Sequence, residues 1–177
     1  MKTMIAYSST HGSAEECACQ LAQKFNEAEV INLKQHSVNP SNYDCVILGS
    51  SIYGGQVQRE VRDYCKKYLG ILLQKPLGIY FTCMTQDETE LRQFLEYAFP
   101  AEIVDHLTTF CAVGGAVYFT KMNFLERSAS RIFLNGFFKS KGLATRCDGK
   151  TDYVTLSQAK IEAFAEKMLG DGERETE

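Results

Sequence analysis

The chain has 177 residues, of which 45% are hydrophobic and 23% are charged; this composition allows a sizeable core and argues against global disorder. No stretch approaches the roughly 20 apolar residues of a transmembrane helix, and the first residues turn polar too soon for a signal peptide. The formal net charge is modest, at −3, and we expect no nucleic-acid partner.

Strand and helix patterns alternate along the chain. Apolar runs bounded by polar residues predict strands, and apolar residues spaced i, i+3, i+4, i+7 predict helices. The long connections between strands favour a doubly wound parallel α/β sheet with helices on both faces. In chain order we predict a strand at 2–7, a helix at 13–26, strands at 29–33 and 45–49, a helix at 57–72, a strand at 77–83, a helix at 88–98, a strand at 109–117 and a helix at 156–169.

Residues 118–150 are too long for an ordinary connection between a strand and a helix. They contain a helical pattern at about 123–138, and we interpret them as an insertion after strand five within a single domain of residues 1–170, followed by a polar tail at 171–177. Seven Lys or Arg and two acidic residues lie between Lys121 and Lys150, a local balance of +5. This asymmetry predicts that the insertion meets an anionic partner.

Cysteines and histidines do not indicate a metal site. The seven cysteines are an odd number without C-x-x-C spacing, and the three histidines are scattered. Without a secretory signal, this pattern indicates reduced thiols in the cytoplasm. We therefore expect no metal and a cytoplasmic location.

The first bend of the chain, YSSTHGSAE at residues 7–15, joins a predicted strand to a predicted helix. Amide groups at a helix start suit a phosphate, Ser9, Thr10 and Ser13 add hydroxyl donors, and Gly12 lets the backbone approach closely. The bend has no lysine, and the sequence lacks both G-x-x-x-x-G-K-[ST] and G-x-G-x-x-G. It therefore favours a monophosphate over a nucleoside triphosphate or a dinucleotide. The alternative is that Ser13 only caps the helix.

This bend resembles the first loop of the flavodoxin family, which follows an apolar-aromatic strand and carries Ser or Thr. Tyr7, Ser9, Gly12, Ala18 and Leu21 match the family pattern in type and spacing. The resemblance implies a flavodoxin-like five-stranded parallel sheet of order 2-1-3-4-5, with FMN bound beyond the carboxyl ends of the strands.

The resemblance also implies a phosphate site in the bend. Ala14 departs from the pattern, because the family usually has Thr there, and the site then lacks one hydroxyl. The ring of His11 is open to a second interpretation, in which only its amide takes part. The implied phosphate site comprises Ser9, Thr10, His11, Gly12, Ser13 and the amide of Ala14.

Two further stretches follow predicted strands and are expected beside the flavin ring. After strand three come small residues and an aromatic that could cover the ring, although a plain glycine turn is the alternative. After strand four come small and polar groups, for which a strand running out into a loop is the alternative. Among them, Cys83 is interpreted as a packed thiol and not as a redox group. The two stretches are Ser51, Ile52, Tyr53, Gly54 and Gly55, and Thr82, Cys83 and Met84.

A closer likeness extends along most of the chain. The start MKT, the stretch SSIYGGQVQREVRDYCKKYLGILLQKP, the stretch AVGGAVYFTKMNFLERSASRIF and a late TDY resemble the menaquinone-dependent protoporphyrinogen oxidases. That resemblance implies an FMN-dependent oxidoreductase of heme biosynthesis that passes electrons from a porphyrinogen to a quinone, with no catalytic side chain that we can name. The alternatives are a soluble flavodoxin-type electron carrier, which the modest net charge disfavours, and an orphan flavodoxin-domain protein that has lost FMN.

The predicted insertion helix has two faces. Arg127, Arg131, Leu134 and Phe138 share one, and an apolar face with Leu125, Ala129, Ile132 and Phe133 lies opposite. We expect the apolar face to pack on the sheet. The mixed face, within 121–150, is expected to touch the inner surface of the cell membrane or to hold porphyrin carboxylates and a quinone. A packed subdomain or a contact between copies in an oligomer is the alternative.

Overall fold

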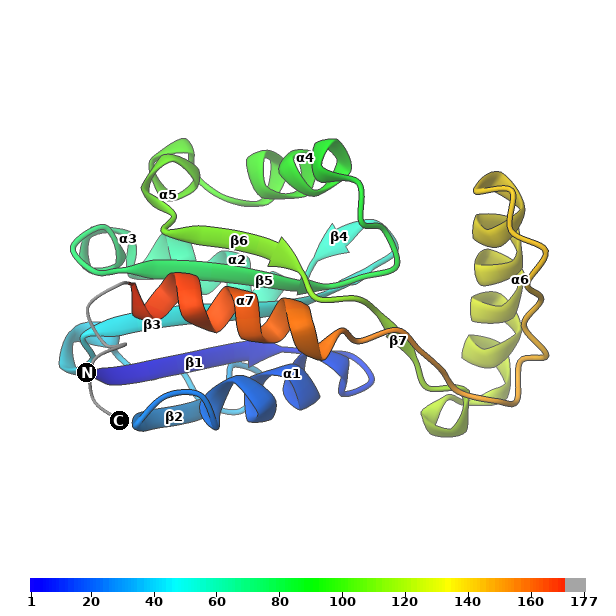
Figure 1. Cartoon of the computed structure of the whole chain (residues 1–177), viewed down its shortest axis with the longest axis horizontal. Coiled ribbons are helices and arrows are strands. Elements are labelled where there is room, and N and C mark those ends of the chain that lie inside the picture. Colours follow the sequence, from blue (N-terminus) through cyan, green and yellow to red (C-terminus); the bar gives the residue numbers. More distant parts are fainter. Residues whose placement is uncertain (171–177) are drawn as a thin grey trace.

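The computed structural model describes residues 1–170, and the predicted tail at 171–177 lies outside the described residues. Five parallel strands form the central sheet in the order β2-β1-β3-β5-β6 (Figure 1). This confirms the predicted flavodoxin-like order, with the short β4 added as an antiparallel partner of β3. The strands are β1 (Lys2–Ser8), β2 (Glu27–Asn32), β3 (Cys45–Tyr53), β4 (Gln56–Val57), β5 (Leu77–Thr82) and β6 (Thr109–Ala112).

Helices cover both faces of the sheet because the side chains of each strand alternate between two cores. Ile47 and Tyr80 face the core under α1 (Ser13–Ala22) and α7 (Gln158–Leu169). Their neighbours Leu48 and Phe81 face the opposite core. The helices on that second face are α2 (Arg59–Lys67), α3 (Leu69–Leu72), α4 (Glu88–Ala98) and α5 (Ala101–His106).

The predicted strand at 109–117 is divided. β6 ends at Ala112, and β7 (Ala116–Val117) instead pairs antiparallel with β8 (Tyr153–Val154). Gly114, which has a φ of 99°, lies at the break between them. The β7-β8 pair brings the two ends of the insertion together at its base.

The insertion carries α6 (Phe124–Ser140), which stands beyond the carboxyl ends of the strands and across their direction (Figure 1). A capping box between Asn123 and Glu126 fixes its start. Its buried side packs a small separate core, so the prediction that the other, apolar face packs on the sheet is wrong. On that face Leu125 is 77% and Ile132 70% exposed. The small core comprises Phe119, Met122, Leu134 and Phe138.

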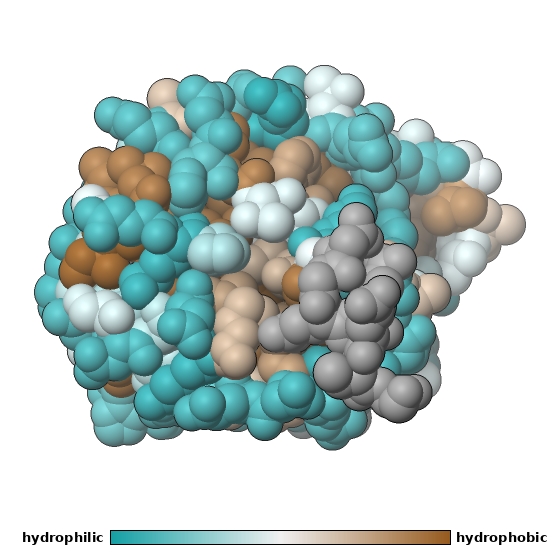
Figure 2. Space-filling view, turned by 60° about the vertical axis from the view of Figure 1, so that its left-hand side comes forward, coloured by the Kyte–Doolittle hydropathy of each residue, from teal (hydrophilic) through white to brown (hydrophobic). Residues whose placement is uncertain are grey.

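The opposite end of the molecule, which comes forward in Figure 2, carries mainly hydrophilic side chains with apolar patches among them. Such a mixture is ordinary for a protein surface. Within residues 1–170, no helix has the length and apolar character needed to cross a membrane.

Candidate functional site

The bend after β1 forms a nest of amide groups. The amides of Gly12 and Ala14 both donate to the hydroxyl oxygen of Ser9, at 3.0 and 3.3 Å. Gly12 is the N-cap of α1, has a φ of 97°, and provides no side-chain cap. Two amides at the positive end of a helix thus converge on one oxygen, which is the donor arrangement that binds an oxyanion.

Ser13 does not cap the helix. Its hydroxyl lies 2.8 Å from the hydroxyl of Thr82 at the end of β5, and both residues are buried. Tyr80 makes a second link between these elements, because its hydroxyl donates to the carbonyl oxygen of Ala14 at 2.7 Å. Burial raises the pKa of Tyr80 well above its ordinary value, so the group remains a donor. β5 therefore fixes the position of the bend.

The end of β3 and the bend after β1 each present one unpaired polar atom to the same region. The hydroxyl of Ser51 and Nε2 of His11 are buried and have no hydrogen-bond partner among the described residues. Ser51 itself is only 7% exposed. The ring of Tyr53 is half exposed and meets the His11 ring edge-on, with centroids 6.0 Å apart. Buried unpaired polar atoms are costly, and both of these residues line the cavity described below, so the two atoms are available to a polar ligand there.

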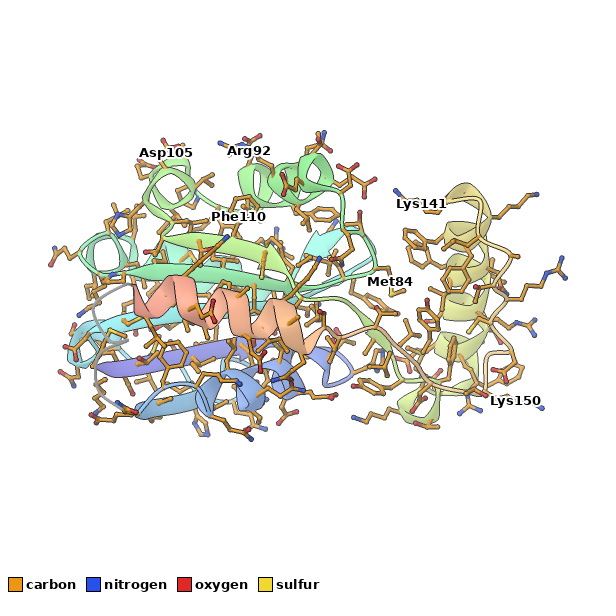
Figure 3. All side chains as sticks on the ribbon, viewed as in Figure 1. Met84, Arg92, Asp105, Phe110, Lys141 and Lys150 are labelled. Atoms are coloured by element: carbon orange, nitrogen blue, oxygen red, sulfur yellow. The ribbon has the colours of Figure 1, made fainter. Side chains whose placement is uncertain are left out.

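The end of β5 adds a thiol and a thioether. Burial raises the pKa of Cys83 to about 12, and its thiol donates to the carbonyl oxygen of Thr85 at 3.4 Å. This supports the interpretation of Cys83 as a packed thiol, because a thiolate is the reactive form. Met84 lies between the sheet and α6 (Figure 3).

These strand ends and α6 enclose a cavity of about 400 Å³. Phe133 and Phe137 line it from α6, and Phe94 and Glu90 line it from α4. The Lys141 ammonium reaches from the end of α6 to the Glu90 carboxylate, at 3.6 Å, and Figure 3 shows Lys141 on the side of α6 that faces the sheet. The sequence analysis did not assign these residues to the flavin site, and it expected Phe133 to pack on the sheet, since only contact across the fold places them beside the strand ends.

A second, more polar cavity of about 310 Å³ lies beside the amide nest. Tyr7, Glu15 and Asn32 line it from the sheet and α1, and Lys121 lines it from the insertion. Lys121 was also missed as a site residue. The positive charge of the insertion predicted an anionic partner, but it did not indicate which lysine would bind the partner or which anion the partner would be.

The structure brings together most of the predicted site residues. Ala14 lines neither cavity and is buried beneath the bend, where its amide joins the nest. Within residues 1–170, no group of three or more His, Cys, Asp or Glu is placed to hold a metal ion. The large cavity is lined by Thr10, His11, Ser13, Ser51, Ile52, Tyr53, Gly54, Gly55, Thr82, Cys83 and Met84, and the second by Ser9, Thr10, His11 and Gly12.

Comparison with known sequences supports the assignment of the fold. Protoporphyrinogen IX dehydrogenase [quinone] from Escherichia coli strain K12 is 30% identical over 99 residues, which cover 52% of this chain and 54% of that protein. The protein of the same name from strain O157:H7 gives the same values. The chain therefore spans about half the length of the curated relatives it matches.

Solved flavodoxins are also similar, at low identity. Oxidised flavodoxin 1 from Bacillus cereus is 17% identical with a TM-score of 0.46, over 78% of this chain and 98% of that chain. A flavodoxin from Fusobacterium nucleatum bound to flavin mononucleotide is 16% identical with a TM-score of 0.43, over 56% of this chain and 67% of that chain. Both TM-scores are low, so the assignment rests on the strand order and on the match of residues 4–135, well over half of the chain, to the family described as "Flavodoxin domain". The chain belongs to the flavodoxin-domain family, and this confirms the family that was predicted from its first loop.

Proposed function

We propose that this protein binds FMN and is an oxidoreductase of the protoporphyrinogen-oxidase-like group. The observation that carries the proposal is the meeting of three strand-end segments and α6 around one cavity of about 400 Å³. The amide nest lies beside it, so a molecule with an anionic end and a flat ring would find suitable partners at both ends. The family match and the FMN named for the Fusobacterium flavodoxin are consistent with this cofactor.

The residues present suit FMN. The hydroxyl of Ser9 accepts from the amides of Gly12 and Ala14, as a phosphate oxygen would. The unpaired atoms of Ser51 and His11 offer partners to the polar groups of the flavin ring, and the exposed ring of Tyr53 is available to cover one of its faces. When bound, FMN supplies two-electron redox chemistry, and the protein binds and orients the ring and limits its contact with water.

The wall opposite the strand ends favours an enzyme over a carrier. A carrier must present its flavin edge to a partner protein, whereas α6 here contributes Phe133 and Phe137 to the cavity. An aromatic wall beside a flavin suits a planar apolar substrate. The E. coli relatives are named for a porphyrinogen and a quinone, and we propose the same classes of electron donor and acceptor for this chain.

We also infer a cytoplasmic protein that docks on the inner surface of the cell membrane. The seven cysteines are an odd number without C-x-x-C spacing, as expected of a reducing compartment. Phe124 is 80%, Leu125 77% and Ile132 70% exposed on α6, and the segment from Lys121 to Lys150 carries a balance of +5. Apolar side chains on a positively charged segment suit an anionic lipid surface.

The visible spectrum of the purified protein tests the cofactor, and turnover tests the reaction. We expect a yellow protein, or a colourless one that becomes yellow on reconstitution with FMN. Under anaerobic conditions, protoporphyrinogen should be oxidised only when a menaquinone analogue is added. A protein that stays colourless after reconstitution refutes the FMN proposal, and a yellow protein without quinone-dependent turnover supports the carrier.

A further inference from the structure

A basic side chain of the insertion reaches the first bend of the chain. Lys121 ends the short 3-10 turn η2 (Phe119–Lys121), far along the chain from Gly12. A Cβ built on Gly12 would lie only 3.2 Å from the Lys121 ammonium nitrogen. Lys121 and Gly12 also line the same polar cavity. The bend has no lysine of its own, and the insertion places one beside it.

Two contacts hold this lysine near the bend. Its ammonium lies 4.3 Å from the centre of the Tyr118 ring, a cation–π contact. The Tyr118 hydroxyl in turn donates to the carboxylate of Glu16 in the first turn of α1. The insertion is thus attached to the same helix start that provides the amide nest.

The Lys121 ammonium is available for a ligand. No hydrogen bond or ion pair engages it within residues 1–170. Lys34 also approaches the bend, but its ammonium donates to the carbonyl oxygen of Ser9 at 2.7 Å and so binds the backbone itself.

The charge around the nest favours such a cation. The Glu15 carboxylate lies 4.0 Å from the same position above Gly12 and lines the same cavity. A phosphate monoester carries nearly two negative charges at neutral pH, so it would be repelled by Glu15. Amides and hydroxyls alone leave that repulsion uncompensated, whereas an ammonium group offsets it and adds a charge-assisted hydrogen bond.

We propose that Lys121 is a phosphate-binding residue, supplied by the insertion to the FMN site. This inference rests on the proposed FMN binding and adds the residue that neutralises the phosphate. It also gives the insertion a second role besides forming the wall of the large cavity, because the anionic end of the cofactor would fasten the insertion to α1.

Binding of FMN and of riboflavin, which lacks the phosphate, separates the lysine from the rest of the site. Wild-type protein should bind FMN more tightly than riboflavin. Lys121→Gln should weaken FMN binding by about tenfold, because it removes the charge-assisted contact with the phosphate. The loss should not be larger, because an exposed contact of this kind is worth less than a buried one. Riboflavin binding should change by less than about twofold, because riboflavin has no phosphate to meet the ammonium. Lys121→Arg should retain most of the FMN affinity, and added salt should weaken FMN binding more in the wild type than in Lys121→Gln.

Lys150→Gln is the matched control, because Lys150 is an exposed lysine of the same insertion (Figure 3) that does not line the polar cavity. It should bind both flavins as the wild type does. Unchanged FMN affinity in Lys121→Gln, or an equal loss for both flavins, would overturn the role of Lys121 while leaving FMN binding in place. Wild-type protein that binds neither flavin would overturn the proposed function together with this inference.

Discussion

The hydroxyl of Tyr80 lies 2.7 Å from the carbonyl oxygen of Ala14 and donates to it, which ties β5 to the first turn of α1. Tyr80→Phe removes this donor from a fully buried position. We expect the free energy of unfolding to fall by about 1 kcal/mol, the typical net worth of such a bond. FMN affinity should fall by up to about fivefold, since the bend is then held less firmly. Urea unfolding and flavin titration measure the two effects.

Tyr97→Phe provides the control for this prediction, because Tyr97 is 80% exposed and lies on α4. It should leave both measurements unchanged. Unfolding curves for Tyr80→Phe that coincide with the wild type would contradict the structural role assigned to the bond.

The ring of Tyr80 also explains why residue 49 is glycine. A Cβ at Gly49 would lie 2.1 Å from both Cζ and the hydroxyl oxygen of Tyr80. Gly49→Ala therefore forces the ring or β3 to move and should cost about 1 to 3 kcal/mol of stability, as overpacked cores do. The melting temperature and urea unfolding measure this cost.

Gly70→Ala is the matched control. Gly70 lies in α3, and a Cβ there meets nothing within 4 Å. This substitution should be neutral or stabilising by up to about 1 kcal/mol, because alanine favours the helix. If both alanine variants had equal stability, close contact with Tyr80 would not be the reason for Gly49.

Local patterns predicted the order of the central sheet well, because β1, β3 and β5 are apolar runs and α1 and α4 have clear stripes. The six-residue α5 is too short to show a stripe and was not predicted. The bend was likewise predictable, since the strand end, Gly12 and the helix start are adjacent in the sequence. The pairing of β7 with β8 was missed because it joins residues far apart in the chain. Two-residue strands also give too little periodicity to detect.

The orientation of α6 shows a different limit. Its sequence has apolar residues on more than one face, so periodicity alone cannot say which one is covered. Leu134 and Phe138 are buried because Phe119 and Met122 lie against them. Leu125 has no such partner core and stays exposed. Lys121 was missed for the same reason: its place beside Gly12 depends on the path of the whole insertion.

The separate core of the insertion predicts that it can loosen independently of the sheet. Leu134→Ala should destabilise this segment by about 2 to 5 kcal/mol, because Leu134 is fully buried. Hydrogen exchange should accelerate in residues 119–153 while the amides of β1, β3 and β5 keep their protection. Leu125→Ala, on the exposed side of the same helix, should leave exchange unchanged. Equal acceleration in the sheet would mean that the insertion and the sheet unfold as one unit.

Docking on a membrane should depend on the exposed side of α6. Replacing both Phe124 and Ile132 by Ser should weaken binding to vesicles that contain anionic lipid by at least about tenfold, since two apolar anchors are lost. Vesicle co-sedimentation measures this, with neutral vesicles as the lipid control and Tyr97→Ser as the control variant. Arg127 is a poorer target, because its guanidinium donates to the carbonyl oxygen of Met122 at 3.1 Å. Equal binding of the wild type and the double variant would refute this docking surface.

Burial of Cys83 predicts low reactivity. Its pKa is raised by burial to about 12, from an ordinary value of 9.0, so the folded protein holds this proton where the unfolded chain releases it. The stability that depends on keeping this thiol protonated is fully present below pH 9.0, and it is lost as the pH rises towards about 12.

At a pH of about 8.5, iodoacetamide should modify exposed Cys19 well before Cys83, as mass spectrometry of the native protein can show. In urea the two thiols should react at similar rates. Rapid native labelling of Cys83 would instead indicate a thiolate beside the cavity and reopen its interpretation as a redox group.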